Sequence, residues 1–123
     1  MKMYIMIWEH VPDKLAPVIA AHASLACYLK FQDDPRMKEW LEKSFKKVVC
    51  RVSESDFKWL KVVDKIDNLK HLSYNITTES ALSGEEVAIT FCPEKSFPEF
   101  FHNFQLWKPA VQSRAYISSH EHL

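Results

Sequence analysis

The sequence predicts an α/β fold in which a four-stranded mixed sheet is sandwiched between helices as three α/β/α layers. Apolar, strand-like runs stand at about 3–8, 47–52, 72–77 and 87–92, and helix-like segments separate most of them. Strands that alternate with helices favour a mixed or parallel sheet with right-handed crossovers. The pattern fades after Lys108, so we expect a single α/β domain over 1–108 and a C-terminal tail or extra arm over 109–123.

The segment from Leu15 to Leu29 is the most informative part of the chain. Its clearly polar residues are His22 and Ser24. A helix that is apolar nearly all round is expected to be buried on most of its faces. Pro17 fits the first turn of this helix, where its missing N–H is not needed.

The other helices are expected at about 35–44, 54–66 and within 93–107. Asp34 and Pro35 open the first of them, and Ser53 followed three residues later by Asp56 has capping-box character. The last segment carries four phenylalanines that suit one apolar helix face. Ser83 and Gly84 mark a turn between the third and fourth strands.

Composition excludes several classes of protein. The net charge is zero, so no overall field draws the chain to nucleic acid. Gly84 is the single glycine, which excludes phosphate-binding loops, dinucleotide folds and nucleophile elbows. No apolar run reaches the roughly 18 residues of a membrane helix, so we expect no association with a membrane. We also expect no signal peptide. Three isolated cysteines predict buried, reduced thiols in a cytoplasmic protein.

His22 and Lys14 are the first candidates for chemistry. Lys14, Val18 and His22 are spaced by four residues, so a helix beginning this early would place Lys14 and His22 on one face. A histidine activates water, and a nearby lysine holds a phosphate or an oxyanion. The alternative is a core histidine with a local hydrogen bond, because buried polar groups are usually satisfied structurally.

The polar segment Asn75–Ser80 lies between the third and fourth expected strands. It offers the amide of Asn75, the hydroxyls of Thr77 and Thr78, and the carboxylate of Glu79. These groups suit catalysis or substrate binding. They equally suit an ordinary turn built on local side-chain hydrogen bonds.

Lys58, Lys61 and Lys65 form a basic stripe on the helix expected over 54–66. The stripe is either a rail that binds the phosphates of a substrate or a solvated helix face. His120 and His122 have metal-like spacing, but they stand in the expected tail without further ligands. We therefore expect neither a metal nor a cofactor.

Several phrases, in order and at similar spacing, resemble the type II peptidyl-tRNA hydrolases of archaea and eukaryotes over about residues 1–108. The family opens with Lys-Met-Val-Ile-Val-Val-Arg and has Ala-His-Ala in a buried first helix. Its second strand, the helix after it and a Gly-Pro after its fourth strand also have counterparts. The matching segments here are Lys2–Trp8, Ala21–Ala23, Lys46–Val49, Glu54–Asp67 and Cys92–Pro93.

The resemblance implies hydrolysis of the ester that joins a peptide to the 3′ ribose of tRNA, without a metal. It implies tRNA as a partner. Together with the aromatic last segment and the tail, it also implies a homodimer. In this interpretation His22 is the central catalytic residue, Lys14 the cation for phosphate or oxyanion, and Thr78 or Glu79 the group that orients water.

At the positions of the family's other site residues, this chain has different residues. With His22 as anchor, its second lysine falls on Leu15 and its glutamine on Ile19. Aligned backwards from Pro93, its aspartate falls on Asn75 and its Gly-Arg-Thr on Thr77–Glu79. Each lost donor that is aimed at the transition state costs about 100- to 1000-fold in rate. The sequence therefore predicts a slow enzyme at best.

Three hypotheses follow. The chain is a divergent peptidyl-tRNA hydrolase, a catalytically inert member of that fold that binds a small ligand or a protein, or an unrelated small α/β domain. The first two separate on whether Lys14 and His22 point into the same cleft as Thr77–Glu79.

Overall fold

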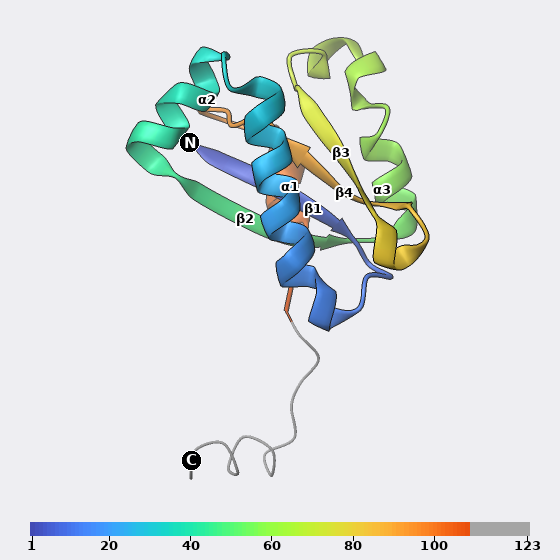
Figure 1. Ribbon diagram of the computed structural model, residues 1–123. Coiled ribbons are helices and arrows are strands. Elements are labelled where there is room, and N and C mark those ends of the chain that lie inside the picture. Colours follow the sequence, from blue (N-terminus) through green and yellow to red (C-terminus); the bar gives the residue numbers. More distant parts are fainter. Residues whose placement is uncertain (109–123) are drawn as a thin grey trace, which may run out of the picture.

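A computed structural model describes residues 1–108, which form an α/β fold on a five-stranded mixed sheet (Figure 1). The strand order is β3-β4-β1-β2-β5; β1 and β2 are parallel, and the other neighbours are antiparallel. The expected mixed sheet is confirmed, with a fifth strand that the sequence did not indicate. The strands are β1 (Lys2–Trp8), β2 (Lys46–Val52), β3 (Tyr74–Glu79), β4 (Glu85–Phe91) and β5 (Gln105–Leu106).

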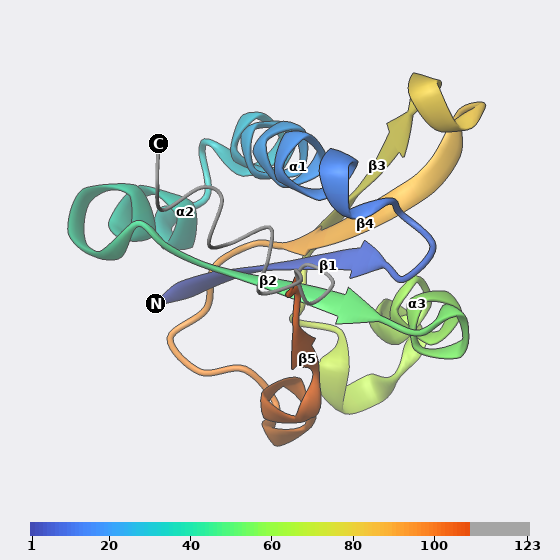
Figure 2. The same ribbon diagram turned by 90° about the horizontal axis from the view of Figure 1, so that it is seen from below.

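Helices cover both faces of the sheet, as expected. Figure 2 shows α1 and α2 on one face and α3 on the other. The α-helices are α1 (Ala16–Phe31), α2 (Pro35–Glu39), which continues as the π-helical turn η2 (Trp40–Ser44), and α3 (Glu54–Leu60). Short 3-10 turns are η1 (Asp13–Leu15), η3 (Val63–Lys65), η4 (Asp67–Leu69), η5 (Ser80–Leu82) and η6 (Glu99–Asn103).

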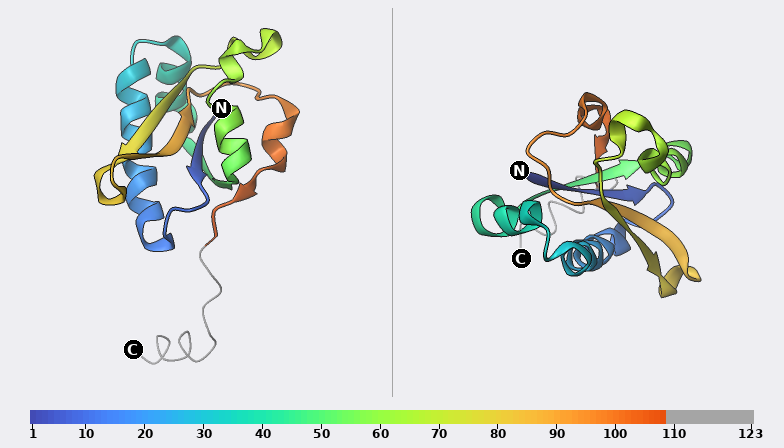
Figure 3. Two further views of the ribbon diagram at one scale, coloured as in Figure 1. Left: turned by 90° about the vertical axis from the view of Figure 1, so that its right-hand side faces the viewer. Right: turned by 90° about the horizontal axis from the view of Figure 1, so that it is seen from above.

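The alternation of side chains along β1 builds two cores. Met3, Ile5 and Ile7 pack on the α1 side of the sheet, and Tyr4 and Met6 pack on the α3 side. Because successive residues of a strand face opposite sides, a continuous apolar strand must be covered on both. The view from the side of α3 shows α3 and η6 lying over the second core (Figure 3).

Local signals in the sequence fix the helix starts. The Asp34 carboxylate accepts a hydrogen bond from the Arg36 N–H, and the Ser53 hydroxyl accepts one from the Asp56 N–H. Both caps satisfy an N–H that has no partner within its helix. Pro17 lies in the first turn of α1, as expected.

The expectation that α1 is buried on most of its faces is wrong. Its buried residues form one stripe against the sheet: Ala16, Ile19, Ala23 and Cys27. Val18, Leu25 and Leu29 are 46%, 59% and 54% exposed. A helix that is apolar all round could be buried on every side, but here the sheet covers only one side of α1.

Ala23→Leu should lower the free energy of unfolding by about 1–3 kcal/mol, because added volume strains a packed interior. Ala23 is fully buried against the sheet, whereas Ala21 on the same helix is exposed. Chemical denaturation measures the loss, and Ala21→Leu is the matched control. Equal stability of both variants would contradict tight packing of α1. Ala20 is half-buried and lines a cavity beside Val49 and Trp107, which gives a larger side chain room.

The last helix expected within 93–107 is also wrong. That segment holds only the five-residue turn η6, after which the chain extends into β5 beside β2. Pro98 stands directly before η6, and a proline fits at a helix start but not inside a helix. The third helix is shorter than expected as well, since α3 ends at Leu60 and turns follow.

Cys27, Cys50 and Cys92 are free and buried, as expected. Burial raises the pKa of the Cys27 and Cys92 thiols to about 12 and that of Cys50 to about 11, so these thiols stay protonated and weakly reactive. None of the described helices is long and apolar enough to cross a membrane. The expected tail, with His120 and His122, lies outside the described residues.

Candidate active site

His22 on α1 and Glu79 at the end of β3 face each other. His22 Nδ1 lies 3.7 Å from Glu79 Oε2, which is within ion-pair range but too long for a hydrogen bond. The His22 side chain is 61% exposed and the Glu79 side chain 13%. The pair therefore opens to solvent on the imidazole side and is shielded on the carboxylate side. The alternative of a buried core histidine is wrong.

The hairpin turn holds Glu79 in place. Its Oε1 accepts a hydrogen bond from the Ala81 N–H at 3.2 Å, and its carbonyl accepts one from the Gly84 N–H at 3.0 Å. Ser83 and Gly84 both have a positive φ, which is the backbone conformation that this tight turn requires. One carboxylate oxygen is thus committed to the turn, and the other is left for His22.

Strand alternation decides which members of the polar segment accompany Glu79. Tyr74 and Ile76 pack in the α3-side core, so Asn75, Thr77 and Glu79 face α1. The irregularity in the pairing of β3 with β4 does not disturb this, because β4 supplies the extra residue.

Thr78, by the same alternation, faces away from His22 and is exposed. The expectation that it orients water beside His22 is therefore wrong. Thr77, expected to bind substrate, lies on the α1 face instead.

Two hydroxyls on the α1 side of the sheet are buried without a hydrogen-bond partner among the described residues. They belong to Thr77 on β3 and Thr90 on β4. Thr90 is completely buried and pairs across the ladder with Asn75. A buried hydroxyl without a partner costs about 1–3 kcal/mol, so such groups are uncommon in cores that only need to pack. Sequence reasoning missed Thr90, because it stands inside an apolar strand.

Lys14 does not join the pair. It is exposed in η1, and α1 begins only at Ala16, so the spacing of four does not place it on a shared helix face. A helix rises about 12 Å over eight residues. No hydrogen bond or ion pair within the described residues connects Lys14 to His22.

Lys58, Lys61 and Lys65 do not form the single helix stripe that the sequence predicted, because α3 ends at Leu60. Lys58 lies on α3, Lys61 at its C-terminal cap and Lys65 in η3, on the face of the sheet opposite His22. Lys61 Nζ lies 2.9 Å from Glu86 Oε1 and is committed to that ion pair.

Within the described residues, no group of three or more His, Cys, Asp or Glu side chains gathers as metal ligands. The chain matches neither a protein-family model nor a curated protein.

Proposed function

We propose that the chain is a divergent, metal-independent ester hydrolase of the peptidyl-tRNA hydrolase kind. The observation that carries this proposal is the contact between His22 Nδ1 and Glu79 Oε2 on an open face of the fold. A histidine oriented by a carboxylate is a recurrent general base. The exposure of His22 suits a large substrate, because the ester at the end of a tRNA needs a site that opens to solvent.

In the proposed reaction His22 takes a proton from water, and the resulting hydroxide forms a bond to the ester carbonyl carbon. With substrate bound, the 3.7 Å contact between Nδ1 and Glu79 tightens to a hydrogen bond that orients the ring, so Nε2 faces the water and the carboxylate stabilises the imidazolium. The tetrahedral intermediate then breaks its bond to the 3′ oxygen of the ribose. That oxygen takes the proton back from His22, which releases a peptide acid and tRNA with a free hydroxyl.

We expect this hydrolysis to be slow. Ile19, which takes the place of the family's glutamine, is fully buried and offers no donor. Lys14 is not positioned beside His22, so it does not supply the cation expected for the oxyanion. Each missing donor removes about 100- to 1000-fold in rate.

The test is the release of an N-acetylated amino acid from its tRNA ester, measured with and without a chelator. We expect turnover above the uncatalysed rate, unchanged by the chelator. Activity should fall as salt rises, because contacts to the RNA backbone release counterions. Hydrolysis at the background rate would contradict the proposal. Loss of activity with the chelator would contradict its metal-independent form.

A binding module without catalysis is the second candidate, and one observation favours it. An apolar groove of about 290 Å³ runs between α1 and the η2 turn. Leu25, Leu41 and Phe45 line it, and they are 59%, 43% and 55% exposed. Exposed apolar patches mark interaction surfaces. Neither His22 nor Glu79 lines this groove.

We expect a second copy of the chain to cover this groove, as a homodimer that buries the same patch on both subunits. Light scattering at micromolar concentration should return twice the subunit mass. Leu25→Glu should return one subunit mass, because it buries a charge in the interface. Leu106→Glu, at a residue 55% exposed on β5, is the matched control and should stay dimeric. One subunit mass for the unaltered chain would rule the homodimer out.

A further inference from the structure

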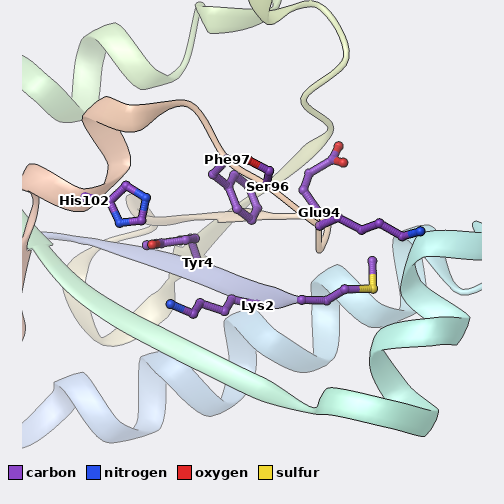
Figure 4. A pocket seen from close by; sticks show the side chains of 8 residues that line it. Lys2, Tyr4, Glu94, Ser96, Phe97 and His102 are labelled. Carbon is purple, nitrogen blue, oxygen red and sulfur yellow. The ribbon is translucent and has the colours of Figure 1, made fainter.

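A second group of polar side chains lines a cavity of about 220 Å³ (Figure 4). Its lining residues are Met1, Lys2, Tyr4, Glu94, Lys95, Ser96, Phe97 and His102. They come from the start of β1, the segment after β4 and the turn η6. Lys2 and Tyr4, on the same face of β1, are thus brought to one hollow with His102, which is distant in the sequence.

This cavity is separate from the His22–Glu79 pair. Tyr4 packs on the α3 side of the sheet, whereas His22 and Glu79 lie on the α1 side. The cavity also lies at the opposite end of the strands, because Lys2 begins β1 and pairs with Glu94 beyond the end of β4. Any ligand bound here would not depend on the proposed hydrolysis.

Tyr4 gives the cavity a fixed hydrogen-bond donor. The residue is 5% exposed, and its ring packs edge-on against Phe97 and Phe101 at 4.9 and 5.1 Å between centroids. Its hydroxyl has no hydrogen bond within the described part of the chain and points toward His102 in Figure 4. Burial raises the pKa of the phenol, so the hydroxyl remains protonated and able to donate.

The charges around the cavity favour an anion. Lys2 and Lys95 make no ion pair within the described residues, and Figure 4 shows the Lys2 side chain extending beneath Tyr4. Glu94 is the acidic residue in the lining, and Arg36 binds its carboxylate. The carboxylate in the lining is therefore already committed to Arg36.

We propose that this cavity binds a terminal phosphate group, as inorganic phosphate or a phosphate monoester. A terminal phosphate has three free oxygens, and the cavity presents donors of three kinds: an ammonium from Lys2, a hydroxyl from Tyr4 and an imidazole from His102. Lysine binds phosphate as a point charge, and arginine binds it through a planar fork of N–H donors. The one nearby arginine, Arg36, is held by Asp34 and Glu94.

The experiment titrates the chain with inorganic phosphate and with ethyl phosphate and follows the backbone amide signals of residues 94–97 and 102 by NMR. We expect saturable shifts in these signals. Tyr4→Phe, which removes only the hydroxyl, should weaken binding by about tenfold, since a hydrogen bond to a charged group is lost. Lys2→Gln should weaken it by a similar factor.

Matched controls are Tyr28→Phe on the α1 side of the sheet and Lys38→Gln on α2, which should bind phosphate as the unaltered chain does. Unsaturable shifts, or unchanged affinity in both Tyr4→Phe and Lys2→Gln, would overturn the proposal. Tighter binding of acetate, or of an RNA that has only internal phosphodiesters, would overturn it too. A chain without hydrolase activity that still binds phosphate at this cavity would leave the inference intact.

Discussion

His22→Ala should reduce the hydrolysis of N-acetylaminoacyl-tRNA by about 100- to 10,000-fold, the range over which a positioned general base contributes. The imidazole is the group that accepts the water proton, and the pair with Glu79 is the arrangement that orients it. His22 is 61% exposed, so its replacement removes little packing and the fold should stay intact. Initial rates with saturating substrate, beside a denaturation curve of each variant, separate chemistry from stability.

Glu79→Gln refines this test. The amide keeps an oxygen that can accept the Ala81 N–H hydrogen bond, but it loses the charge that stabilises the imidazolium. We expect a fall in kcat with little change in unfolding. Glu79→Ala should lower both kcat and the free energy of unfolding, because the turn at η5 loses its cap.

His71→Ala is the matched control, since His71 is an exposed histidine that precedes β3. It should hydrolyse the ester at the unaltered rate. If His22→Ala were as active as His71→Ala, the pair would have no role in catalysis. The binding-module alternative would then gain support only if the unaltered chain were also inactive.

The fold could be predicted largely because strong local signals agreed with one another. The continuous apolar run of β1 predicted cover on both faces, and Met3 and Tyr4 indeed lie in different cores. Asp34 and Ser53 predicted the starts of their helices, because each forms a cap with an N–H only two or three residues away. Such short-range interactions can be predicted from the sequence, because they do not depend on contacts with distant parts of the chain.

The errors concern elements whose state depends on distant contacts. α1 is apolar on sides that nothing in the described chain covers, and composition alone does not tell a covered face from an exposed one. The phenylalanines after Pro93 are spaced as on a helix, but β5 pairs with β2 and ends any helix there. β5 is only two residues long and pairs with the distant β2, so no local sequence pattern indicates it.

The candidate site was predicted in part. His22 and Glu79 were both named, and the structure brings them together, although 56 residues of chain lie between them. Lys14 was named from a spacing that needed the helix to start earlier than Ala16. Thr78 faces the opposite side of the sheet from Thr77 and Glu79, because side chains alternate along β3. The sequence did not predict this, since the bounds of the strand were not known.

Truncation of Phe101 should be costly, as for the other large buried aromatic side chains, Trp40 and Phe91. Phe101 is 1% exposed at the centre of the α3-side core, where its ring centroid lies 5.1 Å from those of both Tyr4 and Phe91. Phe97 and Phe100 lie equally near, at 4.9 Å. Since η6 is a single short turn with no helix of its own to support it, this aromatic cluster is what holds the segment after β4 against the sheet.

Phe101→Ala should therefore lower the free energy of unfolding by about 3–5 kcal/mol, the range for truncating a buried aromatic residue. That is a large share of the roughly 5–15 kcal/mol that stabilises a typical domain. Urea denaturation should show a lower midpoint with an unchanged slope. Phe104→Ala is the matched control: Phe104 is half-buried at the edge of the same cluster, 6.0 Å from Phe101, and should cost clearly less. Equal losses from the two truncations would mean that Phe101 is not the centre of this core and that η6 is held by other contacts.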